Sequence, residues 1–383
     1  MKKIIGFCIV GILIFGLETS YAKKLPVAEK GGKEVNTLDV KTVEGYFQGN
    51  TGAKLKNWYT FDIGKKETFT FTNNDNGIVN KVTSKKRSNL QGVLESKLSD
   101  GKYGGNVTLI NPNGITLKKG FSYKGFKLGL YTNENMDSGI HYSCLKKITG
   151  GASIGQGNKP ETGSLEAHDS QEFRIAKGSL RLNKKGVVSG SGEIVIGENN
   201  SFIAKSAAGE RLRMGSISVG ANSTVALFGE NISVRDMTAT GDASFMLSAQ
   251  KKLFLRGFTG NEATLALGGV NIRSSKAIVA DKLYAFDEYT NSTTGISLKS
   301  APPKLVLAKG TQADAYIGSN TARTLNLDKR TTWIDGVEKT RTNRVRRSNR
   351  NSLGIPTWYG SNLTGLESSF GRDSASIKTS YGW

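Results

Sequence analysis

Paired apolar residues recur through the middle of the chain at a step of about 20 positions. Glycine, Asn or Asp residues separate one pair from the next. The pairs are Ile217 and Val219, Met237 and Ala239, then in a second series Val225 and Leu227, Phe245 and Leu247, Leu265 and Leu267, and Leu283 and Ala285. A period of this length, with two or three short strands in each period, is typical of a β-solenoid.

Composition favours the same all-β class. The chain has 47 glycines but only six prolines, and no proline lies between Pro160 and Pro302. Because proline interrupts the hydrogen-bond ladder of a sheet, this stretch suits many short strands joined by glycine turns. A leucine-rich repeat of similar length would need a helix signal, which the sequence lacks. A two-sheet sandwich with regular strand lengths is the alternative.

The N-terminus has the parts of an export signal. A basic start is followed by a short apolar stretch over residues 4–17 and by a small-x-small site that ends at Ala22. We therefore expect a signal peptide over residues 1–22, with a membrane anchor as the alternative. Cys8 leaves with the signal, so Cys144 is the only cysteine of the mature chain. This departs from disulfide-rich exported proteins and suits transport as an unfolded chain.

The charge balance points to anionic partners. The formal net charge of the 383-residue chain is +21, which favours lipopolysaccharide, sulfated glycans or nucleic acid, although a basic surface can also serve solubility alone. A basic run near the C-terminus is a candidate anion-binding segment, and a solvated linker is its alternative. Its cations are Lys339, Arg341, Arg344, Arg346, Arg347 and Arg350.

Residues 107–117 predict a strand, a rigid corner and a second strand. Apolar and polar residues alternate before the corner, which is the period of a strand with one buried face. In the corner, residues 111–114, the Asn side chains can bond the local backbone, the proline fixes φ, and the Asn-Gly pair tolerates left-handed φ. The apolar alternation resumes at Ile115.

Residues 58–130 resemble the N-terminal secretion domain of filamentous haemagglutinin-like exoproteins, the two-partner secretion family. An Asn-basic-Val element, a later glycine and an Asn-Pro-Asn-Gly-Ile corner after an apolar strand follow one another as in that family. We predict that these residues form a secretion motif: Asn80, Val82, Gly92, Asn111, Pro112, Asn113, Gly114 and Ile115. A second Asn-Pro-Asn-Leu motif, which some members carry, is absent.

The resemblance implies a right-handed parallel β-helix that crosses the inner membrane behind its signal peptide. An outer-membrane two-partner secretion transporter would then carry it to the surface or the medium of a Gram-negative bacterium. The expected organisation is a signal peptide (1–22), a leader (23–55), a haemagglutinin-like secretion domain (56–150), a β-helix continuation (151–300), terminal coils or a cap (301–338) and a basic, flexible tail (339–383).

Candidate catalytic residues are few. His141 lies three positions before Cys144, but no flanking residues match a cysteine protease signature. Glu166, His168 and Asp169 lie close together, yet carboxylates and one His in a short loop are common by chance. No phosphate loop, dinucleotide turn, zinc spacing or calcium-binding nonapeptide is present. We therefore expect no enzyme, no metal and no cofactor.

The function that fits these features is a secreted or surface-associated adhesin of the haemagglutinin type. Its expected partners are the transporter and host or bacterial surface glycans or anionic lipid, and no nucleic acid is expected. The alternative is a secreted cytolysin or a short contact-dependent toxin, whose effector would be the basic C-terminal segment.

Overall fold

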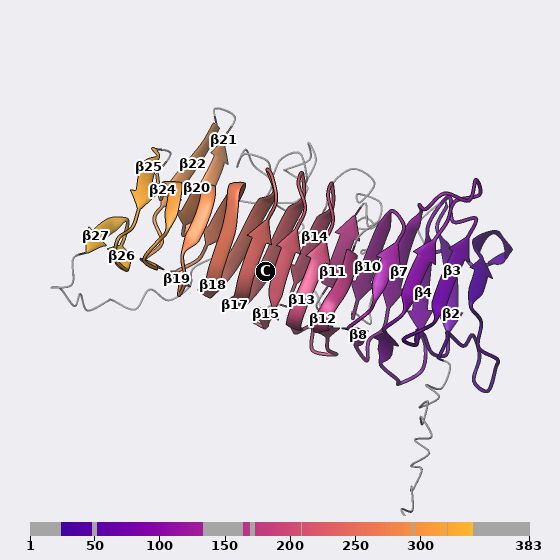
Figure 1. The fold of residues 1–383 in the computed structure, drawn as a ribbon. Helices are drawn as coiled ribbons and strands as arrows, with labels where there is room; N and C mark the ends of the chain where they lie inside the picture. Colours follow the sequence, from indigo (N-terminus) through magenta and orange to yellow (C-terminus); the bar gives the residue numbers. More distant parts are fainter. Residues whose placement is uncertain are drawn as a thin grey trace, which may run out of the picture.

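The computed structural model describes residues 24–47, 52–132, 164–168, 173–207, 209–292, 295–319 and 321–339. They form an elongated rod in which short strands stack from the N-terminal coils, drawn in indigo, to the C-terminal coils, drawn in yellow (Figure 1). The expected fold class, an all-β parallel β-helix, is confirmed, and the rod has about eight turns. The predicted signal peptide lies outside the described residues.

Each coil contributes strands to three lateral faces, which we call A, B and C. In the N-terminal coils, face A contains β2 (Lys54–Trp58), β4 (Ile78–Val82), β7 (Asn106–Ile110) and β10 (Lys127–Tyr131). It continues through β11 (Ser164–His168) and β14 (Ser201–Lys205) to the first part of β17 (Thr224–Ala239) and the first part of β18 (Ser244–Gly268). The last parts of β18, β20 (Ile278–Phe286) and β24 (Gln312–Ile317) complete the face.

Face B follows the same stacking. It contains β1 (Thr37–Asp39), β3 (Thr68–Thr72), β6 (Val93–Ser96), β9 (Ser122–Lys124), the start of β12 (Phe173–Leu182), the end of β13 (Val188–Ile196), β16 (Ser216–Val219), and the parts of β17, β18, β20 and β24 that pair with one another beside it.

Face C completes each coil. It contains β5 (Ser88–Leu90), β8 (Ile115–Lys118), the end of β12, the start of β13, β15 (Arg211–Met214), the middle parts of β17 and β18, β19 (Asn271–Ser274) and β23 (Lys304–Leu307).

The apolar repeat read from the sequence is the inward side of these coils. Ile217 lies opposite Met237 on face B, and Val225 lies opposite Phe245 on face A. Leu265 in turn lies opposite Leu283, and all of these side chains are buried in one continuous core. Full burial of a large apolar side chain contributes about 1.5–3 kcal/mol, so each added coil stabilises the coil below it.

One coil runs against the others. Strand β11 is antiparallel to both β10 and β14, and β12 is antiparallel to β8, β9 and β13. The chain thus reverses its direction before this coil and reverses it again before the regular coils that follow. Where β12 and β13 bend together from one face to the next, Gly178 lies opposite Gly192. A Cβ on Gly178 would lie 2.1 Å from the Ser191 carbonyl oxygen, so the bend requires glycine.

The N-terminal segment differs from the expectation of a loose leader over residues 23–55. Strand β1 pairs in parallel with β3, and Val27 forms bridges to Thr60 and Glu34. Leu25 and Val40 are buried. Irregularly spaced apolar residues give no strand period in the sequence, but here they cover the open end of the first coil, which would otherwise expose its strand edges.

The C-terminal coils are closed by reversed strands. Strand β25 (Arg323–Asn326) is antiparallel to β24, β26 (Thr331–Ile334) is antiparallel to β23, and β27 (Val337–Lys339) is antiparallel to β26. A separate hairpin, β21 (Glu288–Ser292) with β22 (Gly295–Ser300), projects from the rod (Figure 1). Over the described ranges, no helix is long and apolar enough to cross a membrane.

Candidate functional site

The predicted secretion motif occupies neighbouring coils of the N-terminal part. Its Asn-Pro-Asn-Gly corner, residues 111–114, leads the chain from β7 on face A to β8 on face C. It stacks on the preceding corner, residues 83–87, which leads from β4 to β5. The two corners are in register because Ile115 lies opposite Ser88 at the start of the next strands.

Asn111 joins the two corners through its side chain, which is fully buried. Its Nδ2 donates hydrogen bonds to the Lys86 carbonyl oxygen at 3.0 Å and to Ser88 Oγ at 2.9 Å. Its Oδ1 accepts a bond of 3.0 Å from the backbone N–H of Asn113. The second Asn adds one more link, since Asn113 Nδ2 donates to the Ser84 carbonyl oxygen at 3.0 Å.

The other corner residues fix the backbone. Gly114 has a φ of +104°, and its N–H donates to the Asn111 carbonyl oxygen at 2.9 Å. Pro112 is partly buried between the two Asn residues, and Ile115 is buried in the core. A corner of this shape needs a residue that accepts positive φ at its last position, which glycine does without steric cost.

Asn80 lies inside the core and links three strands of face A. Its Oδ1 accepts a hydrogen bond of 2.9 Å from Trp58 Nε1 on β2, and its Nδ2 donates to the Thr108 carbonyl oxygen on β7 at 3.1 Å. Val82, two residues further along β4, is buried opposite Trp58. Because a buried amide costs free energy unless it is bonded, these partners are what make Asn80 compatible with the core.

Gly92 is required by close packing between coils. A Cβ at this position would lie 2.0 Å from the Glu67 carbonyl oxygen and 2.3 Å from the Gly64 carbonyl oxygen. Both contacts are with backbone, which cannot rotate away. The motif residues are therefore brought together as inward-facing or backbone-fixing groups of successive coils, and the geometry gives them a role in forming the coils.

We expect Asn80→Ala to lower the free energy of unfolding by about 1–3 kcal/mol, because Trp58 Nε1 loses its buried acceptor. Urea unfolding of the purified protein measures this. Trp58→Phe removes the donor instead, and the double variant should show a coupling of at least about 0.5 kcal/mol. Strictly additive losses would contradict a direct role for this hydrogen bond.

A charged cluster around Glu95 lies near the surface of this region, and the buried phenol of Tyr123 stays neutral. Glu95 accepts a hydrogen bond of 3.1 Å from Tyr103 Oη and pairs with Lys97 at 3.6 Å and Lys124 at 3.4 Å. Burial raises the pKa of Tyr123 far above its ordinary value. Its hydroxyl therefore remains protonated and donates to the Lys127 carbonyl oxygen at 2.9 Å.

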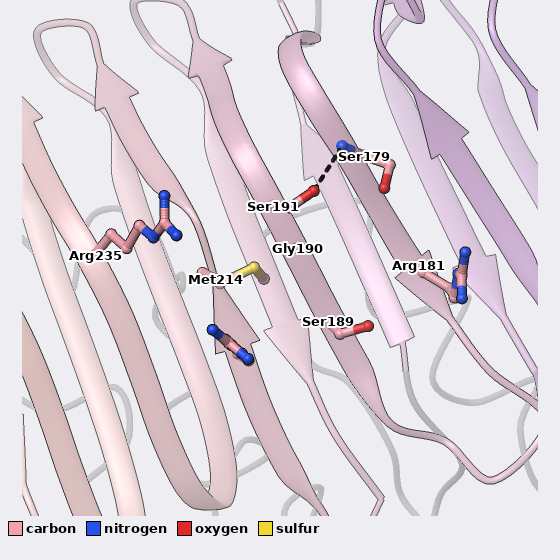
Figure 2. A pocket seen from close by; sticks show the side chains of 8 residues that line it. Ser179, Arg181, Ser189, Gly190, Ser191, Met214 and Arg235 are labelled. Atoms are coloured by element: carbon pink, nitrogen blue, oxygen red, sulfur yellow. Dashed lines mark hydrogen bonds between the residues drawn. The ribbon is translucent and has the colours of Figure 1, made fainter.

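A second feature, which no sequence pattern signals, is a hollow of about 290 Å³ on face C, which we call the arginine groove. Figure 2 shows serine residues and Met214 between Arg181 and Arg235. The residues that line it are Ser179, Arg181, Ser189, Gly190, Ser191, Arg213, Met214 and Arg235.

The groove exists because one strand ladder is interrupted. Strand β13 pairs with β15 only as far as Ser189 opposite Arg213, and it pairs with β16 again from Glu193 onward. Gly190 lies in this interval and, like Met214, lines the hollow. A Cβ at Gly190 would lie 3.2 Å from Leu180 Cδ1 and 3.3 Å from Met214 Sδ, so close packing against these core side chains favours glycine here.

Among the residues that the structure describes, no acidic side chain pairs with the guanidinium groups of the groove. Arg181, Arg213 and Arg235 are exposed, and within the described part of the chain none of them forms an ion pair. Sequence reasoning missed them because they are more than 20 positions apart. Only the reversed strand β12 places Arg181 opposite Ser189, which in turn lies opposite Arg213.

Most of the remaining predicted residues lie outside the described part of the chain. Lys339 is partly buried at the end of β27, and the other cations of the basic run, Arg341 to Arg350, lie outside the described residues. So do His141, Cys144 and Asp169, whereas Glu166 and His168 belong to β11. The residues that the structure describes contain no group of three or more His, Cys, Asp or Glu that could hold a metal ion. The expectations of no enzyme and no metal stay predictions.

Comparison with known families gives a match to part of the chain. The family model of the TPS secretion domain matches residues 28–122, which run from the N-terminal cap to the start of β9 and include the whole predicted secretion motif. The match begins inside the expected leader. A comparison with curated proteins finds no match. The chain therefore carries a TPS secretion domain at residues 28–122, which indicates a two-partner secretion exoprotein exported through a partner transporter in the outer membrane.

Proposed function

We propose that this exoprotein is an adhesin that presents face C to anionic surfaces after export. The observation that carries the proposal is a set of exposed cations that project from successive coils of this face. Strand pairing aligns them along the rod, and within the described ranges none of them forms an ion pair. They are Arg181, Arg211, Arg213, Arg235, Lys252 and Arg273.

Two acidic side chains at the borders of this face, Glu230 and Asp236, are engaged by other cations. Lys251 pairs with Glu230, and Asp236 pairs with Arg256 at 3.3 Å and Lys276 at 3.8 Å. Carboxylates thus neutralise cations at the edges of face C rather than across its width. A surface of one charge sign attracts and concentrates molecules of the opposite sign.

We expect binding of the purified protein to bacterial or host cells to weaken as salt rises, because the Debye length falls from about 8 Å at 0.15 M to about 3 Å at 1 M. Replacing Arg211, Lys252 and Arg273 with Gln should lower cell binding several-fold at 0.15 M salt. Cell-bound protein, measured by flow cytometry with a labelled sample, is the readout.

The matched control replaces three exposed cations at the C-terminal end of the rod, Arg323, Lys329 and Arg330, with Gln. It removes charge of the same kind but leaves face C intact, so its cell binding should equal that of the parent. Equal losses in the control and in the face C variant would show that net charge alone acts, and salt-insensitive binding would also contradict the proposal.

The secretion domain supports a folding role in export. The chain emerges from the transporter as an extended strand, and the corner at residues 111–114 bonds to the preceding corner as soon as both are outside. Each later coil then adds its strands to the exposed edge of the previous one, which spares the chain a search for distant contacts. Burial on every coil makes return through the transporter unfavourable.

The toxin alternative depends on the basic segment from Arg341 to Arg350. Because this segment lies outside the described residues, the alternative stays a prediction, and the adhesin proposal has the support of face C.

A further inference from the structure

We propose that the arginine groove is a binding site for a phosphomonoester carried by a sugar. The inference rests on the adhesin proposal, because it names the chemical group that face C recognises. The groove proposal goes beyond the adhesin proposal. A general attraction between a basic face and an anionic surface needs no groove, whereas a phosphomonoester site requires a defined arrangement of hydrogen-bond donors.

The charge of the site suits a dianion. A phosphomonoester carries a charge of about −1.5 to −2 near pH 7 and offers three strong acceptor oxygens. Arg181, Arg213 and Arg235 supply positive charge, and within the described residues none of them is paired with a carboxylate. The planar guanidinium fork matches two phosphate oxygens at once, which a lysine ammonium does not.

The strand register places the arginines around the hollow. Arg181 lies opposite Ser189, and Ser189 lies opposite Arg213, so the two arginines are two strand spacings apart, about 10 Å. Arg235 is on the next strand, two residues beyond Ser233, which lies opposite Arg213. The arginines thus line the hollow from different strands, and Figure 2 shows Arg181 and Arg235 on opposite sides of it.

The floor of the groove suits the sugar. Ser191 Oγ accepts a hydrogen bond of 3.3 Å from the Ser179 backbone N–H, which leaves the hydroxyl proton of Ser191 available to a ligand. Ser179 and Ser189 add further hydroxyl groups, and the almost fully buried Met214 lines the hollow beside them. The hollow of about 290 Å³ is far larger than a phosphate ion and lies at the lower end of small-ligand sites.

Isothermal titration calorimetry of the purified full-length mature protein tests the site with a panel of hexose 6-phosphates. The comparison ligands are the parent hexoses, inorganic phosphate and the matched hexose 6-sulfates. We expect at least one hexose phosphate to bind about tenfold more tightly than inorganic phosphate, and the neutral hexoses not to bind. The proposal is overturned if no hexose phosphate exceeds inorganic phosphate, or if the sulfates bind as tightly as the phosphates.

Groove variants locate the site. Arg181→Gln, Arg213→Gln and Arg235→Gln should each weaken hexose phosphate binding by about tenfold or more, since each removes charge-assisted hydrogen bonds. Arg213→Lys keeps the charge but loses the fork, so it should also lose affinity. The control with Arg323, Lys329 and Arg330 replaced by Gln should bind as the parent does. Unchanged thermal unfolding of each variant confirms that it has folded.

The two proposals can fail separately. If cell binding depends on Arg211, Lys252 and Arg273 while the groove variants bind hexose phosphates as the parent does, the adhesin proposal stands and the groove proposal is wrong. If the protein binds hexose phosphates through the groove but does not bind cells, the groove stands and the adhesin proposal is wrong.

Discussion

Asn111→Ala is expected to reduce the amount of protein released through the partner transporter several-fold. The substitution deprives the Lys86 carbonyl oxygen, Ser88 Oγ and the Asn113 N–H of a buried partner. The bond to Ser88 is buried and the other two are partly buried, and a buried group left without a partner costs about 1–3 kcal/mol, so the first coils should lose an amount in that range. Quantitative immunoblots of medium and cells, with the transporter co-expressed, measure the release.

Two other variants calibrate this result. Asn113→Ala removes a side-chain bond to the Ser84 carbonyl oxygen but keeps the backbone bond to Asn111, so its effect should be smaller. Asn89→Ala is the matched control, because the Asn89 side chain donates only one long bond of 3.4 Å, to the Arg87 carbonyl oxygen. Its release should be close to that of the parent.

The outcome also separates folding from recognition. If Asn111→Ala is released as efficiently as the parent, the corner has no role in export. If release falls while the refolded variant keeps the parent's stability in urea, the transporter reads Asn111 directly and the folding role is wrong. Loss of both release and stability is the result that the buried geometry predicts.

Gly92→Ala is expected to destabilise the secretion domain even more, although it adds a single methyl group. The new Cβ would lie 2.0 Å from the Glu67 carbonyl oxygen and 2.3 Å from the Gly64 carbonyl oxygen, so the stacked coils must separate. Overpacking a core costs about 1–3 kcal/mol and occasionally more. Because both contacts are with backbone, we expect the upper end of that range or beyond, with little protein released.

The control for this variant is Gly101→Asn. Gly101 has a φ of +81°, and a Cβ at this position would meet no atom of the described residues within 4 Å, so the new side chain enters open space. Asn is among the residues that tolerate left-handed φ, and the midpoint of thermal unfolding should move little. A Gly92→Ala protein that unfolds at the parent's temperature would show that the coils can separate here without cost.

The sequence predicted the parts of this protein that depend on local repetition. In a solenoid, each coil contacts its neighbours in sequence, so apolar pairs such as Val225 and Leu227 recur at the coil length and stack in register. The corner at residues 111–114 could also be predicted from the sequence, because the residues that favour its turn are adjacent to one another in the chain. The order of Asn80, Gly92 and this corner along the chain predicts a secretion domain, and the family match over residues 28–122 supports that prediction.

Tertiary structure decided what depends on contacts between distant segments. Nothing in residues 164–182 signals that β11 and β12 run backward, since an alternating strand has the same pattern in either direction. The sequence does not predict the N-terminal cap, because its apolar residues are spaced to fit the end of the first coil and do not recur at the period of a strand. The arginine groove likewise forms only because the reversed coil places Arg181 beside the strands of Arg213 and Arg235, where Gly190 leaves the ladder open.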